Sequence, residues 1–168
     1  QKKYLALAEG DLSEANDSVF WKEIAIPLAQ DPENSMKMTI SPDGLLPGSR
    51  NAVTYYKNIK SFGNVTLVEL QLETGRTHQI RVHMSGIGHP LLGDTMYNPR
   101  VCLKMSNSKE KKNTEGRINN RNDCFKRAAL HAWKLTFCHP FTDEIITLEA
   151  PLPDDFCRFL NANEEEKT

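Results

Sequence analysis

The sequence contains no segment suited to crossing a membrane. No run among its 168 residues approaches the roughly 18 apolar residues that a membrane-spanning helix needs. Its first residues also lack the charged and apolar stretches of a secretory signal peptide. The four cysteines include no C-x-x-C pair, so reduced thiols are favoured over a disulfide framework, which an even count leaves possible. We therefore expect an intracellular protein with no membrane partner, in the cytoplasm, the nucleus or an organelle.

Several catalytic motifs are missing as well. The sequence has neither the G-x-S-x-G of a nucleophilic serine nor the G-x-x-x-x-G-K-[ST] of a phosphate-binding loop. Gly86 and Gly88 resemble part of a dinucleotide-binding fingerprint, but the third glycine is absent. His78 and His83 are five residues apart, so on a helix they diverge by about 140° and cannot form an i, i+4 metal pair. The sequence predicts neither a metal site nor a cofactor.

Charge is unevenly distributed along the chain, although the net charge is only −1. Residues 100–127 hold nine Lys or Arg against three acidic residues, with almost no apolar periodicity. We expect a long loop or disordered insertion at about 100–126. Such a segment is either a solvated insertion or a basic stripe that contacts phosphates, and the residues do not separate these alternatives. An acidic tail over 164–168 balances part of this charge.

Alternating apolar residues and β-branched segments predict a sheet-forming domain with few helices. Phe62-Gly63-Asn64 predicts a short hairpin connection between two strands. Thr77 is expected to cap a short helix over 78–85, ended by Gly86 and Gly88, and Pro153-Asp154-Asp155 opens a second helix. The fold class predicted for residues 1–163 is α+β, with a mixed, mostly antiparallel sheet and short helices. The expected strands cover residues 4–8, 19–28, 36–40, 52–60, 65–73, 128–137 and 144–149.

The segment from Thr74 to Tyr97 has the pattern of a functional site. Two guanidiniums, two imidazoles and a carboxamide fall within the eight residues from Arg76 to His83, directly after a predicted strand. Arg81 could form an ordinary surface salt bridge, worth at most about 1 kcal/mol. The alternative is a rigidly held guanidinium that pairs with a buried carboxylate or a phosphate. The density of polar donors favours this second interpretation.

Around these residues the chain resembles the RluA-type pseudouridine synthases, which isomerise uridine in ribosomal or transfer RNA. The resemblance is an ordered series of motifs that spans nearly the whole chain, apart from the basic insertion. The matching segments are Lys3–Ala6 with Glu9-Gly10, Ala52–Tyr56, Leu72–His83, Gly88–Tyr97, Arg127 with Leu130–Ala132, Phe137–Pro140 and Ala150–Pro153.

The resemblance implies a mechanism and a set of site residues. The target uridine is flipped out of structured RNA, an aspartate nucleophile helps to detach the base, and no cofactor is needed. Tyr4 would pack on the flipped base and handle the C5 proton, while Arg81 would pair with the catalytic aspartate and keep it ionised. Further residues would bind substrate or support the pocket: Arg76, Thr77, His78 and Gln79, with Leu91 or Leu92 as an apolar wall for the base.

One family motif is missing from this chain. The catalytic aspartate belongs to an R-L-D-x-x-[ST]-S-G segment, which does not occur here, and Asp94 lies in a G-D-x-x-Y turn that the resemblance marks as structural. Since Gln1 also falls in what reads as the middle of a structured unit, we expect the C-terminal portion of a catalytic domain. It would be inactive without the missing N-terminal part. The alternatives are a non-catalytic RNA-binding module and a protein-interaction scaffold.

Overall fold

The computed structural model describes residues 1–12, 20–101 and 125–164. Its main element is a six-stranded sheet with the order β2-β5-β6-β1-β7-β8, in which every neighbouring pair is antiparallel. A second, two-stranded sheet pairs β3 with β4. The predicted α+β fold with a largely antiparallel sheet is confirmed. The strands are β1 (Lys2–Glu9), β2 (Lys22–Ala25), β3 (Leu28–Gln30), β4 (Met38–Ile40), β5 (Val53–Ser61), β6 (Val65–Leu72), β7 (Leu130–Cys138) and β8 (Ile145–Glu149).

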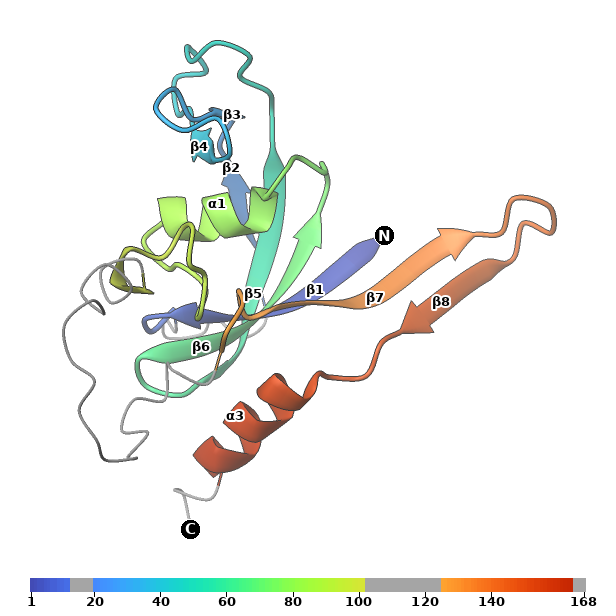
Figure 1. Ribbon diagram of the computed structural model, residues 1–168. Helices are drawn as coiled ribbons and strands as arrows, with labels where there is room; N and C mark the ends of the chain where they lie inside the picture. Colours follow the sequence, from blue (N-terminus) through green and yellow to red (C-terminus); the bar gives the residue numbers. More distant parts are fainter. Residues whose placement is uncertain (13–19, 102–124, 165–168) are drawn as a thin grey trace, which may run out of the picture.

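The main sheet is buried on both faces because its central strands alternate two sets of apolar side chains. Leu5 and Leu7 of β1 pack with Phe156 and Phe159 of helix α3 (Asp154–Glu164). On the opposite face, Ala6 and Ala8 join a cluster with Ile80 and Met84 of helix α1 (Gln79–Gly86). Each helix therefore covers one face of the sheet (Figure 1). Burial of each large apolar side chain contributes about 1.5–3 kcal/mol.

The hairpin between β5 and β6 agrees with its prediction. The Phe62 N–H donates to the Val65 carbonyl at 2.8 Å, which closes the predicted turn. The single strand expected over 19–28 is wrong, because β2 and β3 are separated at Ile26-Pro27 and belong to different sheets. Proline has a fixed φ and lacks the backbone N–H that a strand ladder needs, so the strand ends there and the chain changes direction.

The expected cap of α1 is also wrong. His78, with φ 55°, is the N-cap, and the helix has no side-chain capping hydrogen bond. Gly86 belongs to the helix and Ile87 is its C-cap. Residues 102–124 of the expected insertion and 165–168 of the acidic tail lie outside the described residues.

The β7–β8 hairpin extends away from the body of the domain (Figure 1). Leu135 and Leu148 are cross-strand partners on one of its faces, and Phe137 follows on the same face. Their exposed fractions are 37%, 55% and 37%, which is high for large apolar side chains. We name these three residues the hairpin strip. A strip of this kind typically marks an interaction surface.

Candidate active site

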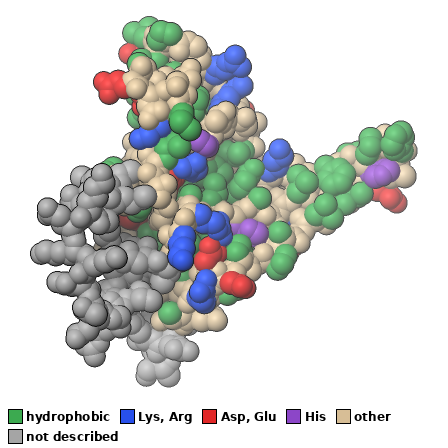
Figure 2. Space-filling view, in the orientation of Figure 1, with side chains coloured by type: hydrophobic (Ala, Val, Ile, Leu, Met, Phe, Trp, Pro, Cys, Tyr) green, Lys and Arg blue, Asp and Glu red, His purple; other side chains and the backbone are tan. Residues whose placement is uncertain are grey.

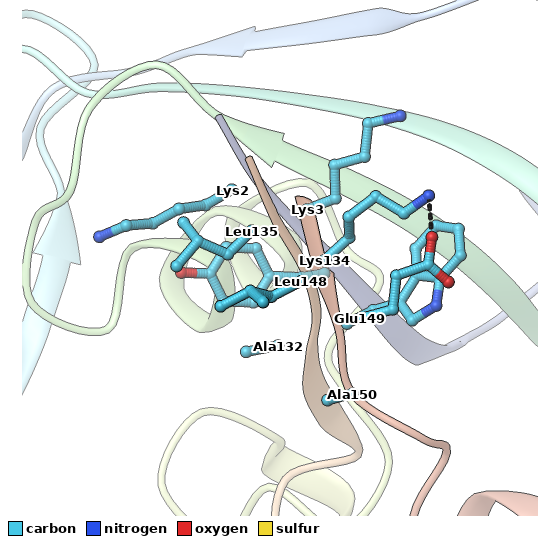
Figure 3. Close-up of a pocket in the computed structure, with 10 residues that line it drawn as sticks. Lys2, Lys3, Ala132, Lys134, Leu135, Leu148, Glu149 and Ala150 are labelled. Carbon is cyan, nitrogen blue, oxygen red and sulfur yellow. Dashed lines mark ion pairs between the residues drawn. The ribbon is translucent and has the colours of Figure 1, made fainter. Parts of the chain in front are cut away.

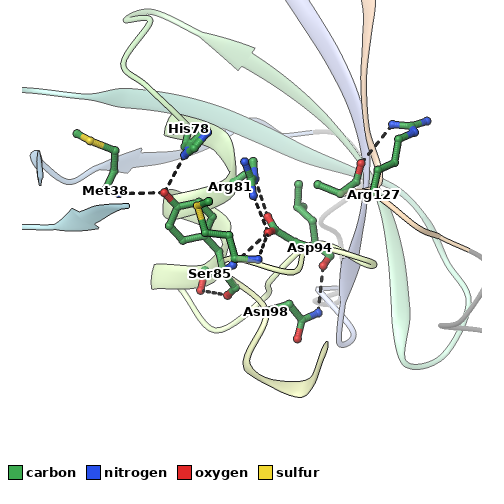
Figure 4. A network of polar contacts seen from close by, with 11 residues as sticks. Met38, His78, Arg81, Ser85, Asp94, Asn98 and Arg127 are labelled. Carbon is green, nitrogen blue, oxygen red and sulfur yellow. Dashed lines mark hydrogen bonds and ion pairs between the residues drawn. The ribbon is translucent and has the colours of Figure 1, made fainter. Parts of the chain in front are cut away.

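Arg81 and Asp94 form the central ion pair of the Thr74–Tyr97 segment. Arg81 Nε donates to Asp94 Oδ2 and Nη2 donates to Oδ1, both at 2.8 Å (Figure 4). The Asp94 side chain has no exposed surface, whereas that of Arg81 is 20% exposed. An internal carboxylate therefore already binds one edge of the Arg81 guanidinium, and the predicted pairing of Arg81 with the catalytic aspartate stays a prediction.

The turn after Gly93 holds the Asp94 carboxylate in place. Oδ1 also accepts hydrogen bonds from the backbone N–H groups of Met96 (3.0 Å) and Tyr97 (3.1 Å). Burial by itself would raise the pKa of Asp94, but the hydrogen bonds from Arg81 and these two N–H groups outweigh it and lower that pKa. Gly93 has φ 67°, and a Cβ there would lie 2.3 Å from the Arg127 carbonyl oxygen, so only glycine fits.

Tyr97 links this ion pair to its surroundings. The Arg81 Cζ lies 4.9 Å from the centroid of the Tyr97 ring, a cation–π distance. The Tyr97 hydroxyl accepts from the Met38 N–H of β4 at 2.9 Å and lies 2.8 Å from His78 Nδ1. Burial and the Arg81 charge lower the pKa of His78, consistent with a neutral ring that accepts the tyrosine proton. Tyr97 thus contacts both Arg81 and His78.

Gln79 organises the backbone at the start of α1. Its Oε1 accepts from the Arg76 N–H and the Thr74 hydroxyl, each at 2.9 Å. Its Nε2 donates to the Val53 carbonyl at 2.9 Å and to Thr54 Oγ1 at 3.0 Å. Both donors and both acceptor positions of the Gln79 carboxamide are used, and the residue is 2% exposed. Gln79 therefore holds the start of α1 against β5 from the buried side.

His83 has a comparable buried place that the sequence did not indicate. Its Nδ1 lies 2.8 Å from Thr54 Oγ1, and its Nε2 lies 2.8 Å from the Ile26 carbonyl oxygen. Because a carbonyl only accepts, Nε2 carries a proton. Burial lowers the pKa of His83 despite the opposing bond to Ile26. The ring therefore connects α1 to β5 and to the chain between β2 and β3.

Tyr4 lies on the sheet face that α1 covers, since it packs against the cluster that contains Ile80 and Met84. Tyr4 also lines an open, mainly apolar depression of about 360 Å³ (Figure 3). The other lining residues include Lys2 of β1 and, from the β7–β8 hairpin, Leu135. Arg81 does not line this depression. The described chain thus places Tyr4 and Arg81 on one face, with only Tyr4 in the depression.

Two predicted substrate contacts, Leu91 and Leu92, are wrong for this structure. Both side chains are fully buried, in the two separate core clusters on either side of the sheet. Their backbone runs beside β1, where the Leu92 N–H donates to the Leu7 carbonyl at 2.9 Å. Side chains without exposed surface fill the core and do not touch a base.

Arg76 and Thr77 lie at another surface. They line a depression of about 400 Å³ with Arg50 and residues of β3 and β4. Arg76 Nε also donates to the Asn51 carbonyl at 3.1 Å. The two residues are accessible, but they do not share the depression of Tyr4.

The described part of the chain lacks two kinds of feature. No group of three or more His, Cys, Asp or Glu in these residues has the arrangement of a metal site. None of the described helices has the length and apolar character needed to traverse a bilayer.

The described geometry can be compared with known proteins. Residues 1–86 match the model of the family described as RNA pseudouridylate synthase. The uncharacterized RNA pseudouridine synthase YlyB of Bacillus subtilis is 38% identical over 159 residues, which are 95% of this chain and 43% of that protein. The ribosomal large subunit pseudouridine synthase D of Pasteurella multocida is 42% identical over 136 residues, 81% of this chain and 38% of that protein.

A solved structure shows the same likeness. The human RNA pseudouridylate synthase domain containing 4 protein superposes with a TM-score of 0.68 at 25% identity, over 97% of this chain and 62% of that one. The chain therefore spans less than half the length of the two curated relatives above and under two thirds of the solved structure.

Proposed function

Since this chain belongs to the RluA-type family of RNA pseudouridylate synthases, we propose that it forms part of an enzyme that converts uridine to pseudouridine in structured RNA, either rRNA or tRNA. In this reaction the N1–C1′ bond breaks and a C5–C1′ bond forms. C5 loses a proton and N1 gains one, so the product is an isomer of the substrate. The atoms balance without any co-reactant, and the proposal includes no cofactor.

The main support is a guanidinium that is held rigidly and remains partly exposed. Arg81 is fixed by Asp94 and Tyr97, and it lies on the same sheet face as Tyr4. Both Tyr4 and Arg81 fall within the segment that matches the family model. In our proposal Arg81 pairs through its free N–H groups with the nucleophilic carboxylate and favours its charged form. Tyr4 packs on the flipped base and handles the C5 proton.

The remaining predicted residues have supporting or peripheral roles in this proposal. Gln79 holds the start of α1, and His78 is a neutral imidazole beside Arg81. Arg76 and Thr77 are accessible to the RNA backbone outside the Tyr4 depression.

The nucleophilic aspartate comes, in our proposal, from an N-terminal part of the catalytic domain that is not in this sequence. Two observations support such a partner. The chain spans 43% and 38% of the length of the two curated relatives. The hairpin strip also exposes apolar side chains next to the depression of Tyr4, and Figure 2 shows hydrophobic side chains gathered along that hairpin. The missing part would cover this strip and complete the pocket.

Tritium release from RNA made with [5-³H]uridine tests the proposal, because the C5 hydrogen leaves only when the base is isomerised. We expect no release with the 168-residue chain alone and release when it is joined to, or mixed with, an N-terminal part that contains the R-L-D-x-x-[ST]-S-G segment. Arg81→Ala in the complete protein should lower kcat by at least ~100-fold, since it removes a preorganised charge. The control is Arg158→Ala, which changes an exposed arginine of α3 on the other sheet face.

Each other result contradicts a defined part of the proposal. Release by the chain alone would show that the nucleophile is within it. A complete protein that releases no tritium, yet binds RNA with strong salt dependence unaffected by Arg81→Ala, would be a non-catalytic RNA-binding module. Absence of RNA affinity at low salt would leave an interaction scaffold.

A further inference from the structure

We propose that Asp94 and Tyr97 are positioning residues that aim the free edge of the Arg81 guanidinium at the nucleophilic carboxylate. This inference rests on the proposed function. It assigns a catalytic positioning role to the G-D-x-x-Y turn, which the family resemblance marks as structural. Neither residue is proposed to touch the substrate. Both act through Arg81.

The geometry of the ion pair leaves a complete binding edge on Arg81. A guanidinium has five N–H groups in a fixed plane. Asp94 binds side-on, to Nε–H and to one N–H of Nη2. One N–H of Nη1 and the second N–H of Nη2 point in parallel and form the end-on edge, which matches the spacing of two carboxylate oxygens. Among the described residues, neither of these two N–H groups has a hydrogen-bond partner. Arg81 can therefore bind a second carboxylate without releasing Asp94.

The contacts around Asp94 explain why this edge has a defined direction. The carboxylate is fixed by the N–H groups of Met96 and Tyr97 and is fully buried. The Tyr97 ring packs on the guanidinium, and its hydroxyl is bound to the Met38 N–H. A free arginine side chain has about 2 kcal/mol of rotamer entropy, which would otherwise be lost when it binds the nucleophile. Holding Arg81 in advance removes that cost from the reaction.

Asp94 also alters what Arg81 contributes electrostatically. The carboxylate and the guanidinium together carry no net charge, so the field of Arg81 at a distance is weakened. The interaction that remains strong is the short-range, directional hydrogen bonding of the N–H groups on the end-on edge. A guanidinium used in this way depends strongly on alignment, and a misplacement of about 1 Å can cost ~100-fold in rate.

The test is a double-mutant cycle in the complete protein, measured by tritium release under single-turnover conditions so that slow variants remain readable. We expect Asp94→Asn to lower the rate ~10- to 100-fold, while the KM for RNA changes less than ~3-fold. In an Arg81→Ala background, Asp94→Asn should change the rate by less than ~2-fold, because residues that act as a unit are not additive. Asp43→Asn, in an exposed loop, is the matched control.

Tyr97 variants keep the test decisive if Asp94→Asn fails to fold, which thermal melting of each variant reveals. Tyr97→Phe retains the ring beside Arg81 and loses only the hydroxyl contacts, so its rate should fall less than that of Tyr97→Leu. Tyr97→Leu removes the ring and should lower the rate ~10-fold or more. Equal losses for Tyr97→Phe and Tyr97→Leu would overturn the role of the ring.

Additive losses in the cycle, or a raised KM with an unchanged rate, would overturn the positioning role of Asp94. If Arg81→Ala itself leaves the rate intact, the proposed function of Arg81 fails. If Arg81→Ala abolishes activity while Asp94→Asn is silent, only the positioning inference fails.

Discussion

Single side chains with every polar group paired determine the shape of the backbone around the site. Gln79 is the clearest case. Its carboxamide bonds both to β5 and to Thr74 and Arg76 of the 74–76 loop. A buried carboxamide of this kind costs free energy when truncated, since the groups it leaves behind are unsatisfied. Gln79 therefore helps to fix the site segment relative to the sheet.

Gln79→Ala should lower the free energy of unfolding by about 2–3 kcal/mol, because it leaves the Arg76 N–H without its acceptor and removes one of the two donors to the Val53 carbonyl, which keeps only the Glu73 N–H. Urea denaturation of the 168-residue chain measures this change. Gln30→Ala, which truncates an exposed carboxamide, should stay within about 0.5 kcal/mol of the parent. Equal effects of the two substitutions would contradict the supporting role of Gln79.

Helix α1 joins two parts of the fold that lie far apart in sequence. It packs on the main sheet through Ile80 and Met84, and its His83 bonds to Thr54 of β5 and to the Ile26 carbonyl. The helix is short, has no side-chain cap and has no acidic residue in its first turn. Its stability therefore comes from tertiary contacts more than from its own sequence.

His83 should make the stability of this helix depend on pH. Its folded pKa is lowered, so the unfolded state binds more protons in the window below the unfolded value of about 6.5. The contribution of neutral His83 is complete above that value and is lost as the pH falls through the window. Urea midpoints at pH 7.5 and pH 5 should differ less in His83→Gln than in the parent.

His78→Asn serves as the comparison, because it removes the neighbouring shifted imidazole, keeps a residue that tolerates positive φ and leaves the His83 contribution in place. An unchanged difference between the two pH values in His83→Gln would show that another group is responsible.

At the scale of the whole molecule, apolar side chains are buried at the centre of the domain and exposed at the end formed by the β7–β8 hairpin. The two helices bury the central strands, whereas the β7–β8 hairpin carries apolar side chains into solvent. Exposed apolar surface of this extent promotes association. The missing part of the domain is our proposed occupant of that surface.

The 168-residue chain should therefore self-associate as its concentration rises, and Leu148→Asp should reduce this association because it charges the hairpin strip. Sedimentation velocity at several concentrations measures the effect. Thr147→Asp adds the same charge to the opposite face of the hairpin, where Thr147 pairs with Thr136, and should have little effect. A parent chain that stays monomeric at high concentration, or equal effects of the two substitutions, would contradict the strip as an interaction surface.

The amino-acid sequence by itself determined the features that neighbouring residues encode. Apolar alternation predicted most strands, and Phe62-Gly63-Asn64 predicted the β5–β6 hairpin. Pro153-Asp154-Asp155 predicted the start of α3. The ordered motifs identified the family that the comparisons also support. These features depend on local periodicity, turn chemistry and residue identity, which can be read without coordinates.

Only the tertiary structure decided which partners the site residues have. It paired Arg81 with Asp94, placed Tyr97 between Arg81 and His78, and buried Leu91 in the core. It also separated β2 from β3 at Pro27. Hydrogen-bond partners and burial depend on how separate elements pack in space, and residue spacing along the chain does not specify that packing.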